Sequence, residues 1–131
     1  MTFPARQYAG IAGTFVLALA VVGMIARLIS GSDYLFNLVN VSWTENLIHT
    51  TTGGLMGYVA YKQSNFALAR TVVGLVGFAY LLVFVVSLLS SNVFGLLGSG
   101  LTLTDNLVHL VLGLAGIYVA YVASTTEQLK V

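Results

Sequence analysis

Apolar residues are concentrated in four long stretches of the chain, at about 6–30, 43–62, 70–90 and 103–123. Each stretch has about 20 residues, the length that an α-helix needs to cross the hydrocarbon core of a bilayer. A membrane β-strand would need only about ten residues. Because lipid offers no partner for backbone N–H and C=O groups, we expect each stretch to be a helix.

The second half of the chain repeats the first. The segment SWTENLIH at 42–49 matches TLTDNLVH at 102–109, and the motif YVAY ends both stretches, at 58–61 and 118–121. The first and third stretches also match, because Ala-Arg precedes two similarly spaced glycines in each. We therefore predict an all-α fold with one transmembrane domain over 1–131. It is an integral membrane four-helix bundle of two tandem parallel-repeat hairpins, at about 5–62 and 69–123.

Polar residues mark the ends of the predicted helices. Ser42 and Glu45 have the spacing of a capping box, and Thr102 with Asp105 is a shorter version of it. Gly31 follows the first stretch, where a helix commonly ends in the left-handed conformation. The mostly apolar connection at 31–41 is expected to lie at the membrane interface as a short amphipathic stretch.

The composition supports a membrane location. Hydrophobic residues make up 58% of the chain and charged residues 7%, with a net charge of +1 and a mean hydropathy of +0.95. A soluble domain carries roughly 25% charged residues. This argues against a soluble enzyme, a disordered chain and a nucleic-acid binder. The chain has no cysteine, so neither disulfides nor thiolate metal sites are expected.

The polar side chains inside the stretches are few and are duplicated. Asn46 and His49 are three residues apart, as are Asn106 and His109, so each pair shares a helix face. Both histidines lie at similar depth, roughly 10 Å into their helices. In the preferred, structural interpretation, these four side chains exchange hydrogen bonds across the bundle and fix the pairing of its halves.

Three other interpretations remain open. His49 and His109 could ligate haem iron or the magnesium of a chlorophyll, with room for the ring provided one turn later by Gly53 and Gly113. The pair could instead line a proton or ion path. A single zinc or iron ion is the third possibility. Its four ligands would be Glu45, His49, Asp105 and His109.

The repeated Asn-x-x-His-x-x-x-Gly motif, at 46–53 and 106–113, resembles a prokaryotic family of small four-helix membrane proteins, domain of unknown function 4383. The resemblance covers most of 5–123. It implies the same order of helices, an Arg-led helix followed by a motif-bearing helix, twice, and no known activity. The signature positions that it marks are Asn46, His49, Gly53, Asn106, His109 and Gly113.

The sequence thus indicates a multi-pass membrane protein that is not an enzyme. The preferred role is structural, or that of a small accessory subunit in a larger membrane complex, without a cofactor. The alternative is a membrane protein that binds haem b or a chlorin through His49 and His109. The expected partners are the lipid bilayer and either other membrane subunits or copies of the chain, and no nucleic acid. The expected location is the inner membrane or another energy-transducing prokaryotic membrane.

The distribution of cations predicts the orientation. Arg6, Lys62, Arg70 and Lys130 fall on the side of the termini and the middle connection, and Arg27 falls on the other side. By the positive-inside rule, we predict that both termini are cytoplasmic. Reporter fusions at the two ends would measure this. A C-terminal reporter that is active only outside the cytoplasm would contradict the assignment.

Overall fold

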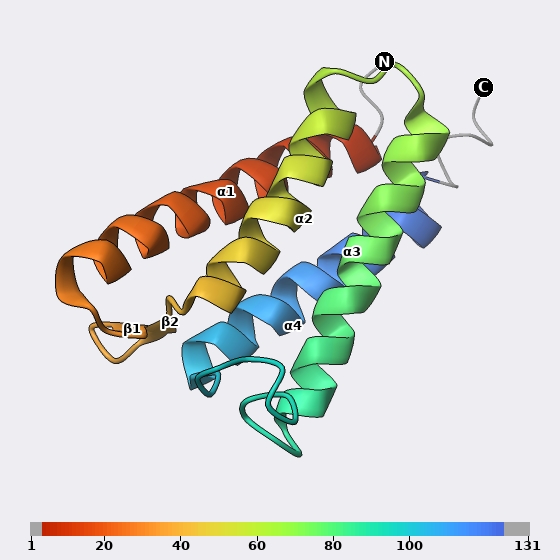
Figure 1. Cartoon of the computed structure of the whole chain (residues 1–131). Helices are drawn as coiled ribbons and strands as arrows, with labels where there is room; N and C mark the ends of the chain where they lie inside the picture. Colours follow the sequence, from red (N-terminus) through yellow and green to blue (C-terminus); the bar gives the residue numbers. More distant parts are fainter. Residues whose placement is uncertain (1–3, 125–131) are drawn as a thin grey trace.

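The computed structural model describes residues 4–124, and these form helices with one small β-hairpin (Figure 1). The all-α prediction is confirmed. The elements in chain order are α1 (Pro4–Ser30), β1 (Tyr34–Leu35), β2 (Val39–Asn40), α2 (Trp43–Tyr61), α3 (Phe66–Ser87), α4 (Leu103–Tyr118) and the π-helix η1 (Val119–Ala123).

The helices are arranged as two hairpins, in which α1 packs mainly on α2 and α3 packs mainly on α4. One end of the bundle holds the β-hairpin and the connection at 88–102, and we call it the loop end (Figure 1). The opposite end holds the start of α1, the short α2–α3 connection and η1, and we call it the terminal end. Arg6 and Arg70 lie near the starts of α1 and α3, which begin at the terminal end as predicted, whereas Lys130 lies outside the described residues.

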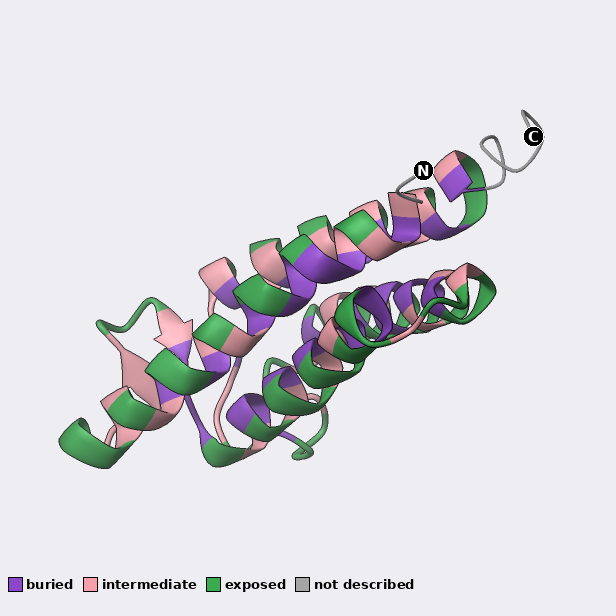
Figure 2. Cartoon of the chain, turned by 90° about the horizontal axis from the view of Figure 1, so that it is seen from above, coloured by how far each residue is buried: buried purple, intermediate pink, exposed green. Residues whose placement is uncertain are grey.

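Small residues form much of the interior, and many large apolar residues are exposed. Figure 2 shows that each helix has a buried side and an exposed side. The buried face of α1 consists of alanine, glycine and one valine. In contrast, Ile11 is 75% exposed, Leu75 63% and Val111 62%. Three helical segments are long and apolar enough to cross a membrane: Pro4–Ser30, Phe66–Ser87 and Leu103–Ala123.

Helix α2 is not among the helices that are apolar enough to cross a membrane, although its boundaries match the predicted second stretch closely. The reason is its polar residues. Glu45, Asn46 and His49 are buried inside the bundle. Thr50 and Thr51 donate from their hydroxyls to the carbonyls four residues earlier, at 2.8 and 2.9 Å. The polar groups of α2 thus largely find partners within the protein.

The two predicted capping boxes differ in the structure. The Thr102 hydroxyl accepts from the backbone N–H of Asp105, and the Asp105 carboxylate accepts from that of Thr102, which closes the box. The Ser42 hydroxyl accepts from the backbone N–H of Glu45, but the backbone N–H of Ser42 donates to the Asn40 side chain, at 2.8 Å. The prediction of a box at Ser42 is therefore wrong in its second half.

The connection at 31–41, predicted as a short amphipathic stretch, forms a β-hairpin. Its turn places Phe36 and Asn37 at positive φ, of 53° and 57°. Gly31 ends α1 at a φ of 67°, as predicted, and its N–H donates to the Arg27 carbonyl at 2.8 Å. The Arg27 guanidinium forms an ion pair with Asp33 and lies 5.8 Å from the centre of the Trp43 ring.

Glycines at matching positions allow close helix contact in both hairpins. A Cβ atom on Gly13 would lie 3.1 Å from the carbonyl oxygen of Gly53, and one on Gly77 would lie 3.1 Å from that of Gly113. Similarly, a Cβ on Gly113 would meet the backbone nitrogen of Leu81 at 2.9 Å. Such contacts between small residues drive helix association where lipid weakens the hydrophobic effect.

Substitution of Gly113 should therefore weaken the bundle. We expect Gly113→Leu to destabilise the protein by about 1–3 kcal/mol or more, because the new side chain must push against the Leu81 backbone. Thermal unfolding in detergent would measure the effect. Gly54→Leu is the matched control, because a Cβ there meets nothing within 4 Å. Equal stability of the Gly113 variant and the parent would show that the close contact is unimportant.

Candidate metal centre

Three buried ionisable side chains meet between α2 and α4. Oε1 of Glu45 lies 3.3 Å from Nε2 of His49 and 3.3 Å from Nε2 of His109. The three residues offer ligand atoms that all lie within 4.8 Å of one another. Glu45 is 1% exposed, His49 5% and His109 2%, so all three side chains are shielded from bulk solvent.

The Glu45 carboxylate lacks a hydrogen bond despite these short distances. Oε1 is buried and has no hydrogen-bond partner among the described residues, and the same is true of Nδ1 of His109. A buried, ionised carboxylate without compensation costs several kcal/mol or more. An ionised Glu45 would therefore need a positive charge close to Oε1, and a cation bound between Glu45 and the two imidazoles would supply it.

Glu45 reaches the interior because Asn40 takes over its capping role. The Asn40 side-chain oxygen accepts the Ser42 N–H that a capping-box glutamate would bind. The Asn40 amide also donates to the carbonyls of Ser99 and Gly100, both at 3.1 Å. These bonds hold Asn40 in place at 1% exposure and leave the Glu45 carboxylate free to point toward the histidines.

Asp105 occupies the equivalent position in the second hairpin but does not join the cluster. Its carboxylate accepts from the backbone N–H of Thr102 at 2.8 Å and from that of Asn40 at 3.0 and 3.1 Å. The Thr102 hydroxyl lies 2.9 Å from the same carboxylate. The structure thus brings together three of the four predicted metal ligands and engages the fourth at the start of α4.

The two asparagines bind away from the histidines, contrary to the expected His–Asn hydrogen bonds. The Asn46 amide donates to the Val41 carbonyl at 2.8 Å. The Asn106 side-chain oxygen accepts from the Ser87 hydroxyl at 2.5 Å, which joins α4 to α3. Asn46 thus stabilises the start of α2, and Asn106 stabilises the contact between α4 and α3.

Tyr80 of α3 closes one side of the cluster, and sequence reasoning missed it. Its ring centre lies 5.3 Å from that of His109 and 6.5 Å from that of His49. The Tyr80 hydroxyl lies 2.7 Å from the Thr52 hydroxyl, within hydrogen-bond distance, and the residue is 2% exposed. Tyr80 occupies the position that Val16 has in the first hairpin. This difference between the repeats could have marked Tyr80 as a residue with a special role.

A cavity of about 160 Å³ adjoins the cluster on another side. Glu45, His49, Asp105 and His109 form its polar wall. The remaining lining residues are Phe15, Leu19, Val39, Thr104 and Val108.

The residues do not fit the haem or chlorin alternative. A ring bound between His49 and His109 would need a flat slot between their imidazoles, but Oε1 of Glu45 lies 3.3 Å from both. The room expected beside Gly53 and Gly113 is filled by Leu17 and Leu81, which a Cβ atom would meet at 3.0 Å or less. A single ion suits the space better than a macrocycle.

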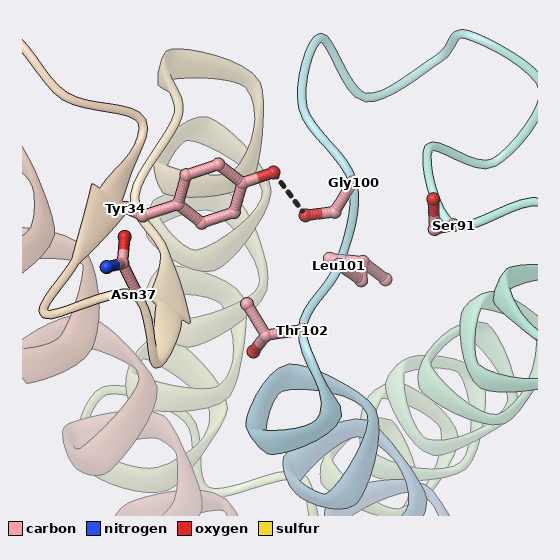
Figure 3. Close-up of a pocket in the computed structure, with 6 residues that line it drawn as sticks. All are labelled: Tyr34, Asn37, Ser91, Gly100, Leu101 and Thr102. Carbon is pink, nitrogen blue, oxygen red and sulfur yellow. Dashed lines mark hydrogen bonds between the residues drawn. The ribbon is translucent and has the colours of Figure 1, made fainter.

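A second, polar pocket lies at the loop end (Figure 3), where Tyr34 from the β-hairpin extends toward the connection before α4. The Tyr34 hydroxyl donates to the Gly100 carbonyl at 3.0 Å. The other lining residues are Asn37, Ser91, Leu101 and Thr102, none of which is ionisable. The hydrogen bond ties the β-hairpin to the second helical hairpin, so this pocket has a structural explanation.

Comparison with known proteins now identifies the family. The chain belongs to the family described as Domain of unknown function (DUF4383), whose signature it matches over residues 6–122. No curated protein and no solved structure matches the chain. The predicted family is thus confirmed, and the family description carries no activity with it.

Loss of the Asn40 side chain should destabilise the loop end. In Asn40→Ala, the buried Ser42 N–H and the partly buried Ser99 carbonyl lose a partner, whereas the Gly100 carbonyl still accepts from the Tyr34 hydroxyl. We expect a cost of about 2 kcal/mol, because unpaired buried polar groups each cost about 1–3 kcal/mol. Denaturant unfolding in mixed micelles would measure it. Asn37→Gly, at an exposed turn position, is the control, and equal stabilities of the two variants would refute the role of Asn40.

Proposed function

We propose that this protein is a multi-pass membrane protein whose bundle binds one divalent transition-metal ion through Glu45, His49 and His109. The observation that carries the proposal is the buried Glu45 oxygen that lies 3.3 Å from two imidazole nitrogens and makes no hydrogen bond. A metal ion would supply the missing positive charge at that point. It would also link α2 to α4, and hence the two hairpins.

The spacing of the ligand atoms supports a tetrahedral ion. Atoms that lie 2.0–2.2 Å from such an ion are about 3.3–3.6 Å from each other. The two Glu45–His distances of 3.3 Å fall at this spacing, and the ligand atoms of the remaining pair, His49 and His109, lie within 4.8 Å of each other. Two imidazoles and one carboxylate suit zinc or iron(II), whereas magnesium and calcium prefer oxygen ligands.

The membrane location rests on the outward-facing apolar residues and on the three helices that are long enough to span. We propose that α2 crosses as the fourth span, because its buried polar groups and back-bonded threonines are shielded from lipid. The terminal end would then face the cytoplasm. Within this framework the protein acts as a structural or accessory subunit that the metal ion stiffens.

Metal titration of the detergent-purified, chelator-treated protein tests the proposal. We expect one equivalent of Zn²⁺ or Co²⁺ to bind and to raise the unfolding temperature, because the ion binds the folded state. We expect binding to weaken more than roughly 10- to 100-fold in each of the variants Glu45→Gln, His49→Ala and His109→Ala. That range is typical for loss of a residue that only contacts a metal ligand, and loss of a ligand itself should cost more. Asp105→Asn is the control and should retain the affinity, since Asp105 caps α4.

Three results would contradict the metal site. Unchanged affinity in the His49→Ala/His109→Ala double variant would place the bound metal elsewhere. Absence of binding in the parent would leave the cluster as a structural contact between Glu45 and the two histidines. A visible Soret or chlorin band in the purified parent that the double variant lacks would support the tetrapyrrole alternative instead.

A further inference from the structure

We infer that the metal ion of the proposed function keeps an open coordination position, and that small uncharged donor molecules reach this position from the lipid between α1 and α4. The inference rests on the proposed metal site. It adds the class of ligand and the route by which the ligand arrives.

The cluster itself leaves the position open. Glu45, His49 and His109 supply three ligand atoms, one fewer than a tetrahedral ion takes. Asp105 cannot readily supply the fourth, because its carboxylate accepts hydrogen bonds from the backbone of Thr102 and of Asn40. Metal sites with three protein ligands typically bind water or a substrate at the fourth position.

The cavity is lined by all three ligand residues, so a molecule in it lies next to the ion. Its volume of about 160 Å³ is enough for a molecule of about five or six non-hydrogen atoms, at about 30 Å³ per water-sized group. Beyond the polar wall it is lined mainly by apolar side chains, among them Phe15, Leu19 and Val108. Such a lining favours an uncharged occupant, because an ion would lose its hydration without replacement.

The route to the cavity runs along the outside of the bundle. A second apolar hollow, of about 260 Å³, shares Phe15, Thr104 and Val108 with the cavity and continues along Val111 and Leu112. Phe15 is 45% exposed and Val111 62%, so this hollow lies open at the surface. Both residues are in mid-helix, where the proposed spans contact lipid. The opening therefore faces the bilayer and not the water at either end.

Ligand binding to the Co²⁺-loaded protein in lipid nanodiscs tests this route. Pyridine is neutral near pH 7 and has six non-hydrogen atoms, whereas azide is an anion and is smaller. We expect pyridine to change the visible d–d spectrum of Co²⁺ and azide at the same concentration to leave it unchanged. Because azide is the smaller probe, its exclusion would reflect its charge.

Variants along the route supply the second measurement. Val108→Trp should block the cavity and reduce pyridine affinity at least tenfold while Co²⁺ remains bound. Val111→Trp, at an exposed position that tolerates bulk, should close the outer hollow with the same effect if the first variant fails to fold. Leu114→Trp is the matched control, because it is an exposed α4 residue that lines neither hollow, and it should bind pyridine normally.

The outcomes separate the two proposals. Failure of the parent to bind Co²⁺ would overturn the proposed function and the inference with it. If Co²⁺ binds but neither probe changes the spectrum, the coordination position is closed and only the inference is wrong. An equal response to azide, or normal pyridine binding in the folded tryptophan variants, would likewise overturn the lipid route.

Discussion

The rest of the bundle is organised around the contact of the buried Glu45 carboxylate with two histidines. The carboxylate lies between the imidazoles of His49 and His109, and so it joins α2 to α4 across the two hairpins. A charge in this position needs compensation and exclusion of water, and the surrounding packing provides the exclusion. The Tyr80 ring covers both histidines. Leu17 fills the space beside Gly53, and Leu81 fills the space beside Gly113.

Glu45 and Asp105, at equivalent positions of the two hairpins, differ by one methylene group and bind different partners. Glu45 and Asp105 follow equivalent capping residues, yet Asp105 closes its capping box and Glu45 points into the bundle. The shorter side chain stays close to its own helix start, where the backbone N–H groups of α4 and of Asn40 stabilise its charge. The longer one is released because Asn40 binds the Ser42 N–H in its place. A repeated sequence thereby produces one asymmetric site.

The apolar outer surface of the bundle explains why its helices pack through close contacts between small residues. Large apolar side chains point outward, so burial of apolar area between the helices brings little advantage where lipid is equally apolar. Close backbone contact takes its place, through Gly13 against Gly53 and Gly77 against Gly113. Hydrogen bonds at both ends complete the assembly. At the terminal end, for example, the guanidinium groups of Arg6 and Arg70 donate to carbonyls near the ends of α2 and α4.

The sequence by itself predicted the helices and the family, and it named Glu45, His49 and His109 among four candidate metal ligands, because apolar length, capping residues and a repeated motif are local features. Only the tertiary structure decided which of the two acids meets the histidines, and that the asparagines bind elsewhere. Those outcomes depend on Asn40 and Tyr80, which lie on other elements and carry no motif. Competition for hydrogen bonds between distant segments is settled only when the hairpins pack together.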